Sequence, residues 1–251
     1  MDKALITGAS SGIGRELAYK LSELGYDLIL VARRRERLEE TAAACKTSCT
    51  IIEADLSKEE EVYALYEKVK GEEKLSMVIN DAGFGLFGEF SESDINRELE
   101  MIDLNIKTVH ILTKLFLNDF IKKNRGYILN VASSASFLPG PLMSTYYATK
   151  AYVQRLSLAI AEEMRREKSN VYIGAFCPGP VDTEFNDVAD VKFNLKGISS
   201  KFAAEYAVKN MLKRKILIVP GKMIKAGVFF QKFVPLKPLL KISYNIQKKK
   251  G

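Results

Sequence analysis

The chain has 251 residues and is 47% hydrophobic, which is enough apolar material for one large domain with a buried core. Its three cysteines and single histidine exclude both a disulfide framework and a clustered zinc site, so we expect a reducing compartment and no structural metal. Asp2 and Lys3 lead directly into a short apolar run, so no secretory signal is expected. No apolar stretch reaches the ~20 residues that span a bilayer.

The net charge of +7 is concentrated at the carboxyl-terminal end of the chain. Residues 221–251 contain eight lysines and no acidic residue, whereas the other 220 residues hold 30 basic and 31 acidic side chains. Because the rest of the chain is nearly neutral, its charge does not indicate a nucleic-acid groove.

Short apolar segments alternate with segments of helical pattern along the chain. The predicted strands lie at residues 3–7, 27–31, 49–53, 75–79, 126–132, 171–176 and 216–219, and the predicted helices at 14–24, 34–44, 59–69, a long segment ending at 121, 149–167 and 201–213. Continuously apolar strands are typical of a parallel sheet covered by helices on both faces, so we expect a doubly wound α/β fold with seven parallel strands. Residues 1–220 form one predicted domain, and 221–251 form a basic, apolar extension.

A glycine-rich turn, TGASSGIG, follows the first predicted strand and opens the first helix. In that context backbone N–H groups and a helix start can bind a pyrophosphate. Thr7 to Gly14 resemble the TGxxxGIG fingerprint of the short-chain dehydrogenase/reductase family. The resemblance implies a Rossmann fold, a nicotinamide dinucleotide as cofactor and hydride transfer to or from a CH–OH or C=O group.

The end of the second strand indicates which dinucleotide is bound. Ala32 stands where NAD-dependent members of the family usually carry Asp, and Arg33 follows it. A guanidinium is a suitable partner for the 2′-phosphate of NADP, so NADP(H) is favoured over NAD(H). The alternative is that Arg33 and the nearby arginines 34, 35 and 37 form a solvated helix start, although cations are unfavourable there.

Two further motifs resemble cofactor contacts of the family. Asp55 follows the third strand, as the family's adenine-contacting acid does, and NDAG at residues 80–83 follows the fourth strand, like the family's NNAG. Asp81 departs from that motif, because the family carries asparagine there. The resemblance therefore leaves the local geometry of this turn open.

The sequence YYATK offers two tyrosines and one lysine. Helical spacing alone favours Tyr146 over Tyr147 only weakly as the partner of Lys150. The family motif YxxxK selects Tyr146 as the general acid/base, with Lys150 lowering the pKa of its phenol, and leaves Tyr147 to pack or to line the cavity.

The resemblance implies two more catalytic residues. Ser133 lies thirteen residues before Tyr146, the family spacing, and would hold the substrate oxygen. Asn105 matches the family's asparagine, which kinks a helix and supports a water-linked proton relay to the lysine. An asparagine within an apolar helix is costly unless it is hydrogen-bonded.

After the sixth strand, CPGPVDT resembles the motif that closes over the nicotinamide. The predicted cofactor site, with no metal, therefore comprises Gly8, Ser10, Ser11, Gly12, Ile13, Gly14, Arg33, Asp55, Leu56, Asn80, Ala82, Gly83, Tyr146, Lys150, Pro178, Gly179, Val181 and Thr183.

The predicted substrate walls are apolar. They come from Phe84, Phe87, residues 137–142, Phe185, Val188, Phe193 and Leu195. We therefore expect an apolar ketone, aldehyde or secondary alcohol as substrate. The alternatives are a 3-oxoacyl thioester, whose anionic carrier Lys192 and Lys196 would meet, and a catalytically silent protein that senses NADP(H).

The partners and location of the chain are less constrained. We expect a homodimer or homotetramer in the cytoplasm, without nucleic-acid binding. Three placements of the basic tail are open: on an anionic membrane, which would put the protein at the inner membrane surface, over the substrate mouth, or against a partner subunit.

Overall fold

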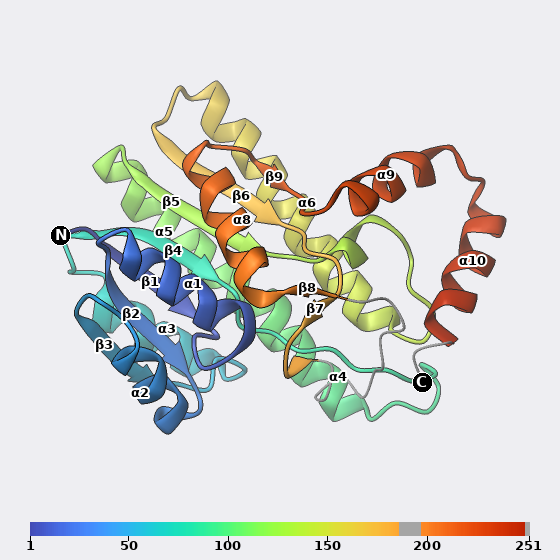
Figure 1. Ribbon diagram of the computed structural model, residues 1–251, viewed down its shortest axis with the longest axis horizontal. Coiled ribbons are helices and arrows are strands. Elements are labelled where there is room, and N and C mark those ends of the chain that lie inside the picture. The colour runs from blue at the N-terminus through green and yellow to red at the C-terminus, as the bar shows by residue number, and fades with distance from the viewer. Residues whose placement is uncertain (186–196, 249–251) are drawn as a thin grey trace.

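The computed structural model describes residues 1–185 and 197–248 of the chain. Its centre is a sheet of seven parallel strands in the order β3-β2-β1-β4-β5-β6-β9 (Figure 1). The strands are β1 (Lys3–Thr7), β2 (Asp27–Ala32), β3 (Cys49–Glu53), β4 (Leu75–Asn80), β5 (Gly126–Val131), β6 (Val171–Phe176) and β9 (Leu217–Ile218). The predicted doubly wound sheet is therefore confirmed.

Helices cover both faces of this sheet and bury two apolar cores. One core lies under α1 (Gly12–Glu23), α2 (Arg35–Ala43) and α8 (Ser200–Leu212), and the other under α3 (Glu59–Val69), α5 (Val109–Lys123) and α6 (Ser144–Arg166). Side chains alternate between the faces along a strand, so Ala4 and Ile6 enter the first core and Leu5 the second. Continuous hydrophobicity of the strands follows from this double burial.

The order of the strands positions the site. β2 and β4 lie on opposite sides of β1, so the chain crosses the sheet between β3 and β4. The chain continues from β1 and from β4 to helices on opposite faces of the sheet, which leaves a crevice at the carboxyl ends of the strands, where open parallel sheets bind ligands.

The long fourth helix is irregular where the resemblance implied a kink at Asn105: α4 (Ile95–Ile102) joins α5 through a π-helical segment, Asp103–Thr108. Other local features differ from the sequence-based expectation. Helix α6 begins at Ser144, before the predicted start at residue 149, so both tyrosines of YYATK are helical. The last strand is only two residues long, and a short parallel pair, β7 (Val181–Asp182) with β8 (Ile198–Ser199), was not expected.

The basic tail is helical. It forms α9 (Lys222–Phe230), a 3-10 turn (Gln231–Phe233) and α10 (Leu236–Lys248), which lie together at one end of the molecule (Figure 1). Across the described ranges, 1–185 and 197–248, none of the helices combines the length and the apolar character that crossing a membrane requires.

Candidate active site

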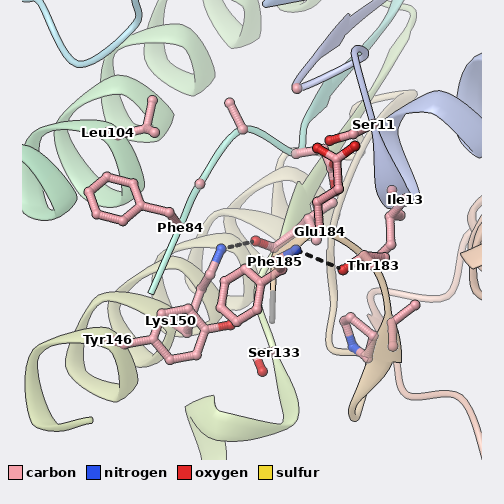
Figure 2. A pocket seen from close by; sticks show the side chains of 18 of the residues that line it. Ser11, Ile13, Phe84, Leu104, Ser133, Tyr146, Lys150, Thr183, Glu184 and Phe185 are labelled. Carbon is pink, nitrogen blue, oxygen red and sulfur yellow. Dashed lines mark hydrogen bonds between the residues drawn. The ribbon is translucent and has the colours of Figure 1, made fainter. Parts of the chain in front are cut away.

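A groove of about 400 Å³ lies at the carboxyl ends of β1, β2, β4, β5 and β6. Figure 2 shows Ser133, Tyr146 and Lys150 at one part of this groove and Ser11 and Ile13 at another. Of the predicted catalytic and cofactor residues, those that line it are Gly8, Ser10, Ser11, Gly12, Ile13, Arg33, Asp55, Leu56, Ala82, Gly83, Ser133, Tyr146, Lys150, Pro178, Gly179, Val181 and Thr183. Residues up to 175 positions apart in the sequence thus share one surface.

The glycine turn wraps the start of α1. Gly8 and Gly12 have φ angles of +72° and +53°, which side chains other than glycine rarely adopt. A Cβ on Gly8 would lie 2.9 Å from the backbone nitrogen of Ala82, so only glycine allows the loops after β1 and β4 to approach. Because α1 begins at Gly12, and Gly12 and Ile13 line the groove, the start of this helix lies at the groove. This turn can receive an anionic group such as a pyrophosphate.

Thr7, at the end of β1, links the loops that follow β1 and β4. Its buried hydroxyl accepts hydrogen bonds from the backbone N–H groups of Asp81 and Ala82, at 3.0 and 3.1 Å. The β1 and β4 ends are therefore held at a fixed distance from each other.

The four arginines near the end of β2 divide into two pairs. Arg35 and Arg37 lie within α2 and form ion pairs with Glu39 and Glu40 of the same helix. Arg33 and Arg34 precede the helix and line the groove. The solvated-helix alternative therefore describes Arg35 and Arg37, and not Arg33 and Arg34.

Arg33 and Arg34 each contact an acid from a distant segment. Arg33 Nη1 lies 3.4 Å from Glu100 Oε1, and Arg34 Nη2 lies 2.8 Å from Glu184 Oε2. Glu184 also lines the groove, although the sequence analysis did not select it. Its position depends on the contact with Arg34, 150 positions away in the sequence, so no local sequence pattern identifies it.

Tyr146 and Lys150 lie one turn apart on α6, and both are buried. The Lys150 ammonium donates a 2.9 Å hydrogen bond to the carbonyl oxygen of Val131 and lies 5.9 Å from the centroid of the Tyr146 ring. Ser133 caps the 3-10 turn that follows β5, because its hydroxyl accepts from the N–H of Ala135 at 3.1 Å. The cap fixes the Ser133 side chain beside the tyrosine.

Burial is the largest influence on the pKa values of Tyr146 and Lys150. It raises the pKa of Tyr146 above the ordinary value of 10.0, and the Ser133 hydroxyl acts in the opposite direction. It also lowers the pKa of Lys150 to about 8, against the attraction of Asp81. The net shift of the Tyr146 pKa is upward because desolvation is its largest cause, and the lowering by Lys150 stays a prediction.

Asp81, the departure from the family motif, faces the glycine turn. Its Oδ2 lies 2.7 Å from the position that a Cβ on Gly14 would take. Burial raises the pKa of Asp81 to about 7, while Lys150 and the Gly14 N–H oppose that shift. The groove therefore contains a carboxyl group that titrates near neutral pH.

Asn105 lies behind the groove, in the π-helical segment. Its side-chain oxygen accepts from Phe84 N–H at 3.1 Å, and its amide donates to Phe84 O at 2.9 Å and to Thr149 Oγ1 at 3.1 Å. A Cβ on Gly83 would lie 2.8 Å from the Asn105 oxygen and 3.3 Å from the Lys150 nitrogen, so both of these groups lie next to Gly83. The predicted helix irregularity at Asn105 is present.

Two predicted cofactor contacts do not line the groove. The Asn80 amide donates to Asn130 Oδ1 at 2.8 Å and to Thr113 Oγ1 at 3.4 Å, so this side chain joins β4 to β5 inside the core. Gly14 lies under the turn, where a Cβ would overlap the Gly8 carbonyl. Both residues lie beneath the groove. The side chain of Asn80, the last residue of β4, points away from the crevice, and Gly14 is already inside α1.

The substrate end of the groove is apolar. Phe84, Leu104 and Phe185 line it near Tyr146 (Figure 2). Met143 and Tyr147 also line it, and Phe87 packs against this cluster. Met143 lines the groove, whereas the predicted segment 137–142 does not. The expected contributions of Val188, Lys192, Phe193, Leu195 and Lys196 lie outside the described residues.

The tail packs on the wall of this end. Gln231 Nε2 donates to Phe137 O at 3.1 Å, Ser243 Oγ donates to Pro139 O at 2.8 Å, and Gln247 Nε2 donates to the Tyr147 hydroxyl. Ile224 lies beside Gly179. Of the three placements left open by the sequence, the described part of the tail therefore occupies the border of the substrate mouth.

The chain matches the family model for short chain dehydrogenases over residues 2–194. An uncharacterized oxidoreductase of Staphylococcus epidermidis is 33% identical over 189 residues, covering 74% of this chain and 81% of that protein. Human 17-beta-hydroxysteroid dehydrogenase type 3 is 30% identical over 214 residues, covering 83% of this chain and 66% of that protein.

Solved structures agree with this result. A short-chain dehydrogenase from Sphingobium yanoikuyae in complex with NADPH superposes with a TM-score of 0.85 at 27% identity, over 93% of both chains. A short-chain dehydrogenase/reductase from Burkholderia phymatum in complex with NAD has a TM-score of 0.84 at 24% identity, over 92% of this chain and 93% of that one, and shows the fold alone. The chain belongs to the short-chain dehydrogenase/reductase family and is an oxidoreductase acting on CH–OH or C=O groups.

Proposed function

We propose that the protein is an NADP(H)-dependent oxidoreductase that interconverts an apolar ketone or aldehyde and the corresponding alcohol. The observation that supports this most directly is the juxtaposition of Ser133, Tyr146 and Lys150 at the apolar end of a groove whose other end is a glycine turn. A proton donor and an oxygen-binding hydroxyl thus stand beside the space for a carbonyl.

The residues present fit a dinucleotide. Gly8 and Gly12 allow backbone N–H groups and the start of α1 to face a pyrophosphate, and Arg33 and Arg34 offer guanidinium groups at the adenosine end. When bound, the nicotinamide ring would supply or accept the hydride. Asp55 and Leu56 would border the adenine, and Pro178, Gly179 and Thr183 the carboxamide.

Each catalytic residue has a distinct role in this proposal. Tyr146 gives a proton to the substrate oxygen or takes it back, and Ser133 donates a hydrogen bond to the same oxygen. The Lys150 ammonium favours the phenolate form of Tyr146. Asn105 holds the Phe84 backbone and borders Lys150, so it would fix the point through which protons reach that lysine.

The apolar lining from Phe84, Leu104, Met143 and Phe185 favours a hydrophobic substrate. Reduction of a 3-oxoacyl thioester is the enzymatic alternative, since the same four catalytic groups would serve it. A silent NADP(H) sensor is disfavoured because a sensor would need only the dinucleotide end of the groove.

For its assembly and location, we propose a homodimer or homotetramer that works in the cytoplasm and reaches the inner membrane surface through its tail. Light scattering after size exclusion would test the assembly, and a monomer at all concentrations would contradict it.

The test of function is NADPH consumption with a panel of apolar ketones, aldehydes and one 3-oxoacyl thioester. Tyr146→Phe is compared with Tyr63→Phe, a matched control on the exposed face of α3. We expect turnover that Tyr146→Phe abolishes and Tyr63→Phe retains. Tight NADPH binding without turnover of any carbonyl would favour the sensor.

A further inference from the structure

The two tail helices present different surfaces to the protein and to solvent. Ser243 and Gln247 of α10 are buried, with 2% and 1% of their surfaces exposed, and both donate hydrogen bonds to the body of the protein. One face of α10 is therefore attached to the wall of the substrate end. Lys237 and Lys241 lie on the other side of this helix and are exposed.

The solvent side of the tail is unusually apolar. Phe229, Phe230 and Phe233 are 55%, 64% and 71% exposed. The centroid of the Phe229 ring lies 5.4 Å from the ring centroids of both Phe230 and Phe233. Met223, Leu236, Ile242 and Ile246 of the same segment are also about half exposed or more. The contiguous exposed cluster of Phe229, Phe230 and Phe233 marks an interaction surface.

The charge of the same segment selects the partner. Residues 221–251 contain eight lysines and no acid. Two copies joined through this surface would bring lysines against lysines, which is unfavourable. Nucleic acid would satisfy the lysines and leave the aliphatic and aromatic side chains in water. An anionic lipid surface satisfies both, because its headgroups attract lysine and its acyl region accepts Phe and Leu side chains.

We propose that residues 222–248 are a membrane-docking surface, with Phe229, Phe230 and Phe233 inserted among the lipids of an anionic membrane. The tail borders the groove through Gln247 at Tyr147 and Ile224 at Gly179, so docking places the substrate mouth at the lipid surface. An apolar carbonyl dissolved in the bilayer then enters the groove without crossing water. The docking stands on the tail alone, whereas this route for substrate rests on the proposed function.

Co-sedimentation of the full chain with lipid vesicles tests the proposal. Vesicles of phosphatidylcholine with about one third phosphatidylglycerol are compared with vesicles of phosphatidylcholine alone, at low and at high salt. We expect at least a tenfold preference for the anionic vesicles, weakened by salt because the attraction is screened.

Two double variants separate the aromatic cluster from exposed aromatics in general. Phe230→Ser with Phe233→Ser should lower vesicle binding at least tenfold. Phe90→Ser with Phe202→Ser removes side chains that are 66% and 46% exposed on the body, and should leave it unchanged. Lys237→Gln with Lys241→Gln should remove the anionic preference, and Lys201→Gln with Lys213→Gln should retain it.

NADPH fluorescence in the same samples keeps the two proposals apart. Failure to bind NADPH would contradict the proposed function and leave the docking test intact. Equal sedimentation of the Phe230→Ser, Phe233→Ser variant and wild type would overturn the docking, as would binding to neither vesicle. A self-association that the same variant abolishes, without vesicle binding, would also overturn it in favour of a second copy.

Discussion

The Lys150 ammonium points to the carbonyl oxygen of Val131, at 2.9 Å, while it lies 5.9 Å from the centre of the Tyr146 ring. The strand that ends in the Ser133 turn therefore also holds the lysine in place. Because both side chains are buried, each charged form is disfavoured by desolvation and depends on the other's position.

Replacement of either partner should remove most of the activity. We expect Lys150→Met and Tyr146→Phe each to lower kcat about 10²- to 10⁴-fold, the usual contribution of a positioned acid/base. Since the two groups act as one unit, the double variant should lose little more than either single one. Multiplied losses, measured in steady-state assays, would show that they act independently.

The raised pKa of Asp81 predicts a pH-dependent stability. The pKa of Asp81 is about 7 in the folded chain, whereas the ordinary value for an aspartate is 3.8, so the folded state binds more protons between these two pH values. The unfolding free energy should therefore fall as pH rises through this window and level off above it.

Asp81→Asn should remove that dependence. Between pH 5 and pH 8 the variant should gain about 3 kcal/mol over wild type in urea unfolding, since wild type loses about 1.4 kcal/mol per pH unit up to the Asp81 pKa of about 7. A constant difference between the two proteins across this range would contradict the shift.

Arg33 is predicted to read the 2′-phosphate. Arg33→Asp should weaken NADPH binding about 10- to 100-fold, the loss of one or two charge-assisted hydrogen bonds, and should change NADH binding far less. Arg35→Asp is the matched control, because Arg35 is paired with Glu39 within α2. Equal losses for both dinucleotides in titrations would rule out the assignment.

The hydrogen bonds of Asn105 should be visible in stability. Asn105→Leu leaves the buried N–H and C=O of Phe84 unpaired and should cost about 2–4 kcal/mol of unfolding free energy. Thr149→Val removes one of these bonds and should cost about 1 kcal/mol. If urea unfolding gave a similarly small loss of unfolding free energy for both variants, the π-helical segment would not depend on Asn105.

Gly14 is expected to act through packing. Gly14→Ala should destabilise the fold by several kcal/mol, roughly the cost of overpacking or more, because its Cβ would overlap the Gly8 carbonyl and approach Asp81 Oδ2. Gly71→Ala, where a Cβ meets open space, should be neutral or slightly stabilising in thermal unfolding. A stable Gly14→Ala protein would contradict the close packing of the turn.

Much of the fold and the site follows from the sequence because both depend on local patterns. Burial on two faces makes each central strand continuously apolar, and TGxxxGIG and YxxxK have fixed positions on these strands and helices. Asn80 could not be placed in the same way, since its bonds to Thr113 and Asn130 depend on which strands are neighbours. The pairing of Arg34 with Glu184 also arises only in three dimensions.

The electrostatics were the least predictable part. The pKa of Tyr146 depends on how deeply the ring is buried, and burial reverses the direction expected from a neighbouring cation. The tail offered three placements because its pattern of lysines and apolar residues suits each of them. Its contacts with Phe137, Pro139 and Tyr147 come from polar side chains that the pattern does not single out.

The most direct test of hydride transfer uses NADPH carrying deuterium at both C4 positions of the nicotinamide, with the carbonyl that wild type consumes fastest. Mass spectrometry of the product should find one deuterium on the carbinol carbon, and Tyr146→Phe should bind NADPH normally while forming no labelled alcohol. A product without deuterium, or undiminished labelled product from Tyr146→Phe, would contradict the proposed chemistry.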